Sequence, residues 1–236
     1  TPNIYGWTED LTGFADLVHE NKALLIISSN PMSLGMFKSQ ADWGADIAIG
    51  GTQPFGLSTY FGGPSVGYIS TGLKLTRKMP GRIVGQTKDI DGERAFVLTL
   101  QAREQHIKRE RATSNICSNQ ALAAMGSGVY LSTIGWKGLK EAASQSFQKA
   151  HYLYKRLTEE LGLKALAEQS FFNEFTLEIP NADNFLIDME SQGIFAGVGL
   201  GQFYPELKDA VTIAVTEKRT KIEMDAYVDL MKRLLK

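Results

Sequence analysis

The three histidines and the single cysteine are the residues from which a metal site or a nucleophilic site could most readily be built. His19, His106 and His151 are far apart in the sequence, and no two of them have metal-ligand spacing. No histidine stands beside Cys117, which favours a small buried cysteine over a nucleophile. Neither a nucleophile elbow nor a P-loop occurs. The residues therefore predict no metal site and no catalytic group of these kinds.

A glycine-rich stretch is the first feature that could bind an anion. Of the 23 glycines, 10 fall between Gly50 and Gly92. Successive backbone N–H groups in such a turn can form a nest for a phosphate, and the alternative is a tight turn between two strands. The candidate residues are Gly62, Gly63, Pro64 and Ser65.

A charged segment followed by polar residues is the second candidate. It begins at Arg103 and ends in Thr113, Ser114 and Asn115, which are good N-cap residues for a following helix. The N-terminus of a helix with hydroxyl groups is a ready anion site. The alternative is a solvated charged helix with an ordinary cap.

A turn at Pro80-Gly81 followed by Arg82 is the third candidate. The guanidinium fork of Arg82 could bind a carboxylate with two parallel hydrogen bonds. The alternative is a surface or interface ion pair. The residues alone leave these alternatives open.

The first half of the chain has the helix–strand alternation of an α/β layer. The continuous apolar run from Ala23 to Ile27 predicts a strand buried on both faces. A helix is expected over 9–22, further strands over 46–49 and 66–70, and mostly loop over 50–72.

The second half predicts an antiparallel α+β layer. Its expected elements are helices over 118–133, 136–161 and 182–192, a strand around Phe175 to Ile179, a strand over 210–215, and a final helix that begins with a capping box of Thr220 and Glu223. The final helix is expected to bury Ile222, Tyr227, Leu230, Met231 and Leu234. We place the domains at 1–120 and 121–236.

Composition excludes several classes of protein. The 236 residues hold 25 Lys and Arg against 26 Asp and Glu, a balance that argues against a nucleic-acid-binding protein. A hydrophobic content of 43% argues against disorder. The longest clean apolar run is far shorter than the roughly 20 residues of a membrane helix. One cysteine permits no intrachain disulfide and fits the reducing cytoplasm.

Three long runs, taken together, resemble one family. They are GADIAIGGTQPFGLSTYFGGPSVGYIS from Gly44, KMPGRIVGQT from Lys78 and REQHIKRERATSNIC from Arg103. The chain resembles the glycine cleavage system P proteins, and more specifically the α-chains of two-chain bacterial glycine dehydrogenases (decarboxylating). The similarity is dense from Pro2 to about Glu160 and looser beyond. Because those α-chains are nearly twice as long, the resemblance implies a C-terminal fragment.

The resemblance implies an α/β fold, the later part of the large domain of a fold type I pyridoxal phosphate (PLP) transferase, followed by a small α+β domain. The implied reaction is decarboxylation of glycine with PLP as electron acceptor. The aminomethyl group then passes to the lipoyl arm of the H protein.

The family's cofactor lysine is missing from its expected place. No lysine occurs between Asp46 and Gly72, and the matching stretch is Gly50 to Gly56. The resemblance therefore implies an α-chain without catalytic residues, whose partner, the β-chain (subunit 2), carries the PLP lysine. It also implies that the 62–65 loop and Thr113 to Asn115 line the interface near that PLP. The alternative is a non-catalytic scaffold with a degenerate PLP-transferase fold; the missing lysine argues against an autonomous aminotransferase-like enzyme.

Overall fold

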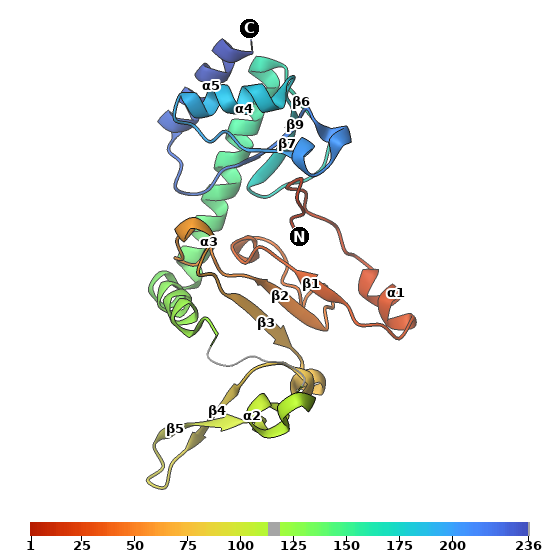
Figure 1. Cartoon of the computed structure of the whole chain (residues 1–236), viewed down its shortest axis with the longest axis vertical. Helices are drawn as coiled ribbons and strands as arrows, with labels where there is room; N and C mark the ends of the chain where they lie inside the picture. The colour runs from red at the N-terminus through yellow and green to blue at the C-terminus, as the bar shows by residue number, and fades with distance from the viewer. Residues whose placement is uncertain (113–118, 236) are drawn as a thin grey trace.

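The computed structural model describes residues 1–112 and 119–235. Figure 1 shows an elongated molecule with a C-terminal unit at one end, a small sheet in the middle and a hairpin at the other end. One long helix, α3, runs from the middle into the C-terminal unit. The candidate site lies where these two parts meet.

The middle sheet has three strands in the order β1-β2-β3. β1 and β2 are parallel, with Ile26 opposite Ile47, and β2 and β3 are antiparallel. The three strands confirm the predicted ones within a few residues, whereas the preceding helix is shorter than the expected 9–22. The elements are α1 (Phe14–Glu20), β1 (Ile26–Ser28), β2 (Ile47–Gly51) and β3 (Gly67–Thr71).

The expectation that the first strand is buried on both faces is wrong. Leu25 and Ile27 are buried, but Leu24 is 53% exposed and Ile26 is 55% exposed. The preceding helix α1 buries no residue, so it does not cover this face. A continuous apolar run predicts two-sided burial only when both layers are present.

A two-stranded hairpin extends from the sheet. It consists of β4 (Ile83–Lys88) and β5 (Arg94–Thr99), followed by the four-residue helix α2 (Gln105–Lys108). Arg103 fixes its base, because its guanidinium donates hydrogen bonds to the carbonyls of Thr76 at 3.1 Å and Gly81 at 2.8 Å. The sequence analysis did not predict this hairpin, since Gly85 and polar residues interrupt the alternation of β4.

The long helix α3 (Ala121–Leu161) changes direction at Gly135. The dihedral angles of Gly135 are φ 59° and ψ −175°, a conformation that only glycine adopts readily. This break confirms the two helices that were predicted on either side of it. Among the described residues, no helix is long and apolar enough to cross a membrane.

The C-terminal unit is an antiparallel sheet covered by helices. The strand order is β6-β7-β9-β8, and the second half of α3 packs with α4 and α5 around one apolar core. The predicted strands and helices of this half are confirmed. The elements are β6 (Lys164–Ala165), β7 (Glu174–Glu178), α4 (Ala182–Ser191), β8 (Val198–Gly199), β9 (Ala210–Ala214) and α5 (Lys221–Leu234).

The capping box of the last helix is confirmed, but its buried face was partly wrong. Tyr227, Leu230 and Met231 are buried, as expected. Ile222 is 81% exposed and Leu234 is also exposed, whereas Met224 and Val228 are buried in their place. Ile222 lies two residues before Met224, which in a helix turns it to the opposite side.

Residues 4–8 pack against the C-terminal sheet. Trp7 forms an isolated β-bridge with Phe171, and the Thr176 hydroxyl donates to the carbonyl of Tyr5 at 2.9 Å. A side chain at Gly6 would collide with the backbone of Glu174. These contacts hold the segment before β1 on the C-terminal unit.

Candidate functional site

The candidate site is a cleft at the carboxyl ends of β1 and β2. Because the two strands are parallel, the residues that follow them meet at one edge of the sheet, the usual position of ligand sites in open α/β sheets. We call this cavity of about 320 Å³ the sheet-edge cleft. Its polar side chains are those of Asn30, Gln53, Ser58, Tyr130, Ser146, Asn173, Thr216, Glu217 and Lys218.

The loop after β2 is held by hydroxyl groups and an aromatic stack. The Thr52 hydroxyl donates to the carbonyl of Val66 at 2.9 Å and accepts from the Ser127 hydroxyl at 3.2 Å. The rings of Phe55 and Tyr130 stack at 6.1 Å. With Thr52 and Phe55 buried, the intervening Gln53 is exposed at the cleft.

The wall from the C-terminal unit is built around Ser146 of α3. Its buried hydroxyl accepts from the backbone N–H of Glu217 at 2.9 Å and lies 3.4 Å from the Glu217 carboxylate. The Lys149 ammonium donates to the carbonyl of Glu217. Burial, and then the charge of Glu217, raise the pKa of Tyr130, so its phenol stays neutral at physiological pH.

Asn173 has an unsatisfied polar group at this wall. The residue is more than nine-tenths buried, and its Oδ1 atom has no hydrogen-bond partner. Its backbone carbonyl accepts from the N–H of Val215 at 2.8 Å, so the residue continues the pairing of β7 with β9 by one position and is firmly placed. Buried amides are normally paired, which makes this one a candidate contact for a ligand.

The residues of the cleft do not fit a covalently held PLP. Such a site needs a lysine amine at the sheet edge and commonly an Asp or Arg beside the pyridine nitrogen. Gln53 and Asn30 supply neutral amides at the ends of β2 and β1. Lys218 is the one lysine of the lining, and it is exposed on the turn after β9.

The structure does not bring the predicted loop of residues 62–65 into this cleft. Gly62, Gly63, Pro64 and Ser65 form the loop before β3, where all but the half-buried Gly63 are exposed. The N–H of Gly62 is used within the turn, donating to Thr59 at 2.8 Å. Thr113, Ser114 and Asn115 lie outside the described residues, as does Cys117.

The histidines have structural surroundings. His19 lies 2.8 Å from the Asp46 carboxylate, which also accepts from the N–H of Leu25. His151 lies between the rings of Phe147 and Phe171, with both centroids at 4.0 Å. In the described part of the chain, no three His, Cys, Asp or Glu side chains are grouped to hold a metal ion.

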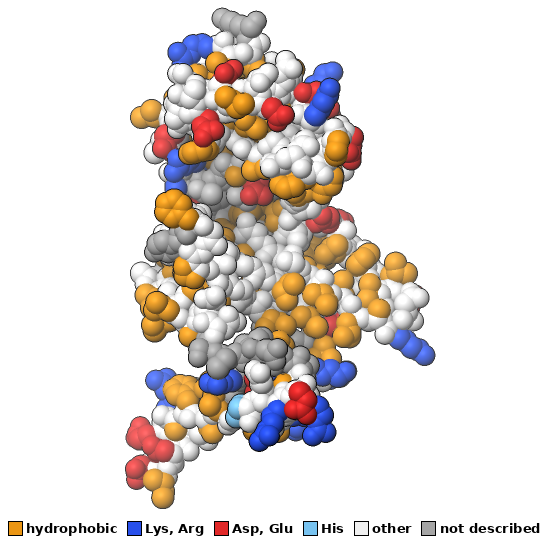
Figure 2. Space-filling view, viewed as in Figure 1, with side chains coloured by type: hydrophobic (Ala, Val, Ile, Leu, Met, Phe, Trp, Pro, Cys, Tyr) orange, Lys and Arg blue, Asp and Glu red, His pale blue; other side chains and the backbone are white. Residues whose placement is uncertain are grey.

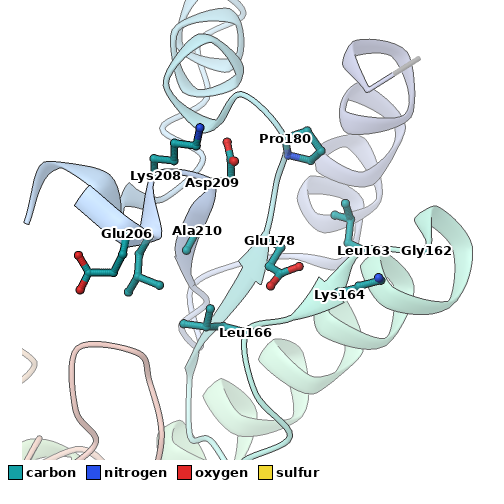
Figure 3. A pocket seen from close by; sticks show the side chains of 11 residues that line it. Gly162, Leu163, Lys164, Leu166, Glu178, Pro180, Glu206, Lys208, Asp209 and Ala210 are labelled. Atoms are coloured by element: carbon teal, nitrogen blue, oxygen red, sulfur yellow. The ribbon is translucent and has the colours of Figure 1, made fainter. Parts of the chain in front are cut away.

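A larger hollow of about 550 Å³ lies on the C-terminal unit (Figure 3). Its charged side chains are those of Lys164, Glu178, Glu206, Lys208 and Asp209. All of these except the half-buried Asp209 are exposed, and Asp209 accepts a hydrogen bond from the N–H of Asn181 at 3.1 Å. Its described lining includes no buried polar side-chain atom without a partner, in contrast to the sheet-edge cleft.

Sequence reasoning missed the polar residues of the cleft. Asn30 and Gln53 had a usable signal, because each follows a predicted strand at the edge where parallel strands end. Tyr130, Asn173 and Glu217 carry no local signal. They reach the cleft only through the packing of α3 and the C-terminal unit against the sheet.

Comparisons with known proteins agree with this fold. The family model described as "Glycine cleavage system P-protein" matches residues 1–231. The chain is 50% identical to the "Probable glycine dehydrogenase (decarboxylating) subunit 1" of Carboxydothermus hydrogenoformans, over 98% of this chain and 52% of that protein. The protein of the same name from Moorella thermoacetica is 48% identical over 99% and 53%. The chain thus spans about half the length of these curated relatives.

Solved structures of known proteins have a similar fold. A crystal structure of glycine decarboxylase (P-protein) of the glycine cleavage system, in inhibitor-bound form, matches all of this chain and 54% of its own, with a TM-score of 0.93 and 36% identity. A cysteine desulfurase from Thermococcus onnurineus matches with a TM-score of 0.67 and 13% identity, over 98% of this chain and 57% of its own. These likenesses confirm the expected PLP-transferase fold. The chain belongs to the glycine cleavage system P-protein family.

Proposed function

We propose that this chain is part of a glycine-decarboxylating enzyme, as the α-chain that lacks the cofactor lysine. The observation that carries the proposal is the composition of the sheet edge: Asn30 and Gln53 end the two parallel strands, and no lysine occurs from Asp46 to Gly72. Membership of the P-protein family and 50% identity to a relative named subunit 1 support it.

The cofactor belongs, in this proposal, to a partner chain. PLP, held by a lysine of the β-chain (subunit 2), supplies the electron-accepting ring on which glycine loses carbon dioxide. The aminomethyl group passes to the lipoyl H protein, and the complex works in the cytoplasm. This chain completes the partner's site and holds no catalytic residue of its own.

Two segments of this chain are proposed to line the interface near the partner's PLP. The first is the exposed loop of Gly62, Gly63, Pro64 and Ser65. The second holds Thr113, Ser114 and Asn115, which lie outside the described residues. Backbone N–H groups and hydroxyls suit a phosphate, which accepts strong hydrogen bonds.

The domain division at residues 120 and 121 is part of the same proposal. Residues 1–120 would belong to the large domain and 121–236 to the small one. Limited proteolysis of the full-length chain, with mass analysis of the stable products, tests it. A stable product that begins near residue 121 is expected, and cleavage confined to other regions would contradict the division.

Cofactor trapping tests the function. The full-length chain, alone and mixed with its lysine-bearing partner, is incubated with PLP, reduced with borohydride and digested for peptide mass analysis. We expect one stoichiometric label on the partner and none on this chain. A stoichiometric label here would overturn the proposal.

An activity assay distinguishes an accessory catalytic subunit from a non-catalytic scaffold. Glycine decarboxylation is measured for the partner with and without this chain, at saturating PLP and H protein. We expect activity to require the full-length chain. Full activity of the partner alone would instead support the scaffold.

A further inference from the structure

We propose that the sheet-edge cleft of this chain is itself a binding site for a small zwitterion of the amino-acid class. It would use Glu217 and Asn173 for an ammonium group, and Lys218 and Gln53 for a carboxylate.

The first argument is the unsatisfied amide of Asn173. Its Oδ1 atom is buried without a hydrogen-bond partner, while the residue lines the cleft. The two ends of an amide have nearly the same shape, so half a turn of the group exchanges its oxygen and its NH₂ at the cleft. After such a turn the oxygen lies at the accessible end of the amide, so Asn173 can offer an acceptor to a ligand ammonium group.

The cleft also carries one acidic and one basic side chain. Glu217 and Lys218 are neighbours on the turn after β9, and both line the cleft. Within the described residues neither belongs to an ion pair. One free charge of each sign beside neutral amides suits a ligand with both an ammonium and a carboxylate, and disfavours a ligand of single charge.

The backbone of Glu217 is held in place, and its carboxylate accepts from the Ser146 hydroxyl at 3.4 Å. Its backbone N–H and carbonyl are bonded to Ser146 and Lys149, two residues of the same face of α3. The neutral phenol of Tyr130 faces it across the cleft. A held carboxylate loses less conformational freedom on binding than a mobile surface one.

The volume of the sheet-edge cleft also suits a small amino acid. A volume of about 320 Å³ is at the lower end of small-molecule pockets, which start near 300 Å³. Met32, Leu57 and Phe172 supply apolar surface beside the polar groups. The cleft therefore has room for an amino acid with a small side chain.

The experiment uses the full-length chain in complex with its partner after borohydride reduction. Reduction locks the partner's PLP as a secondary amine, so that the partner can no longer form an imine with glycine. Binding of radiolabelled glycine is measured by equilibrium dialysis, with methylamine and acetate as probes of each end alone. The full-length chain without its partner is measured in parallel.

Three variants make the test specific. Glu217→Gln keeps the backbone clamp and removes the charge, and Asn173→Leu removes the amide at similar size. Glu206→Gln is the matched control, because Glu206 lines the larger hollow instead. Thermal unfolding confirms that each variant is folded.

We expect saturable glycine binding to the reduced complex and to the chain alone, weakened about tenfold by Glu217→Gln and by Asn173→Leu and unchanged by Glu206→Gln. A tenfold change corresponds to about 1.4 kcal/mol. Acetate or methylamine alone should bind far more weakly than glycine. Absence of saturable binding, or equal binding by all three folded variants, would overturn the site. Since the cofactor-trapping result does not depend on this cleft, failure of one proposal is distinguishable from failure of the other.

Discussion

Neutral amides at the sheet edge change what the cleft can do. An amine at the position of Gln53 could bond covalently to an aldehyde, whereas an amide can only form hydrogen bonds. Asn30 uses its Oδ1 to accept from the N–H of Met32 at 3.0 Å, so it also shapes the turn after β1. The cleft is thus suited to reversible polar binding.

The hydroxyl groups of Thr113 and Ser114 provide a test at the level of single residues. Changing both to Ala in the full-length chain should weaken PLP binding to the assembled heteromer at least about a hundredfold, because each hydrogen bond to a charged phosphate is worth about 1.5–3 kcal/mol and two are lost. PLP affinity is measured by titrating the apo complex and following absorbance. The control is Ser191→Ala at the end of α4, an exposed hydroxyl that should leave affinity unchanged. Equal affinity in the double variant would contradict the proposed contact.

His151 provides a pH-dependent test. Burial between Phe147 and Phe171 lowers its pKa below the usual 6.5, against a smaller opposing effect of its hydrogen bond to Phe171. As pH falls below about 6.5, His151 takes up a proton in the unfolded chain but not in the folded chain. The free energy of unfolding therefore falls by at most about 1.4 kcal/mol per pH unit. Above that pH both the folded and the unfolded chain hold a neutral imidazole, so this loss of stability is absent.

His151→Phe should remove this part of the pH dependence. Free energies of unfolding in urea are compared between pH 5 and 8 for the full-length chain and the variant. His106→Gln, on the exposed helix α2, should retain the wild-type slope. Parallel curves for wild type and His151→Phe would show that the histidine does not contribute.

At the scale of elements, the sequence predicts local features better than assembled ones. The break of α3 at Gly135 and the capping box of α5 follow from spacing and residue type alone. The uncovered face of β1 and the polar lining of the cleft depend on which layers meet, and no local pattern encodes that. Asn173 illustrates the limit, because its unpaired amide is visible only once β7 and the cleft are both in place.

The break in α3 gives a matched pair of glycine substitutions. Gly135→Ala should destabilise the protein by about 1–3 kcal/mol, because its φ of 59° with an extended ψ is a glycine conformation. Gly128→Ala lies on the same helix with helical backbone and open space around it, and should stabilise by up to about 1 kcal/mol. Thermal and urea unfolding measure both. A neutral Gly135→Ala would mean that the helix can straighten.

At the scale of the whole molecule, segments from both halves of the sequence line the sheet-edge cleft. Residues 4–8 are held on the C-terminal sheet while the next elements build the middle sheet, and α3 returns from that sheet to the same C-terminal unit. Ligand binding between these parts would therefore draw together segments from both halves of the sequence. The larger apolar surfaces lie away from this junction, over α1 and β1 and along the first half of α3 (Figure 2).

The exposed apolar stripe of α3 predicts how residues 1–236 behave when produced alone. Leu122, Met125 and Val129 are exposed at helical spacing, and contiguous apolar surface of this kind is rare on monomeric proteins. We expect a second copy of the chain to cover the stripe, so that the sedimentation coefficient rises with concentration in the micromolar range.

Lysines on the stripe should oppose this association. Met125→Lys with Val129→Lys adds two positive charges, which would be desolvated in a dimer, and should shift the chain toward monomer. Gln148→Lys with Glu159→Gln makes the same change in net charge at two exposed positions in the second half of α3. This control should leave association unchanged. Sedimentation velocity at matched ionic strength separates the two cases. Equal association of both double variants would place the contact elsewhere, whereas loss in both would make net charge, and not the stripe, the cause.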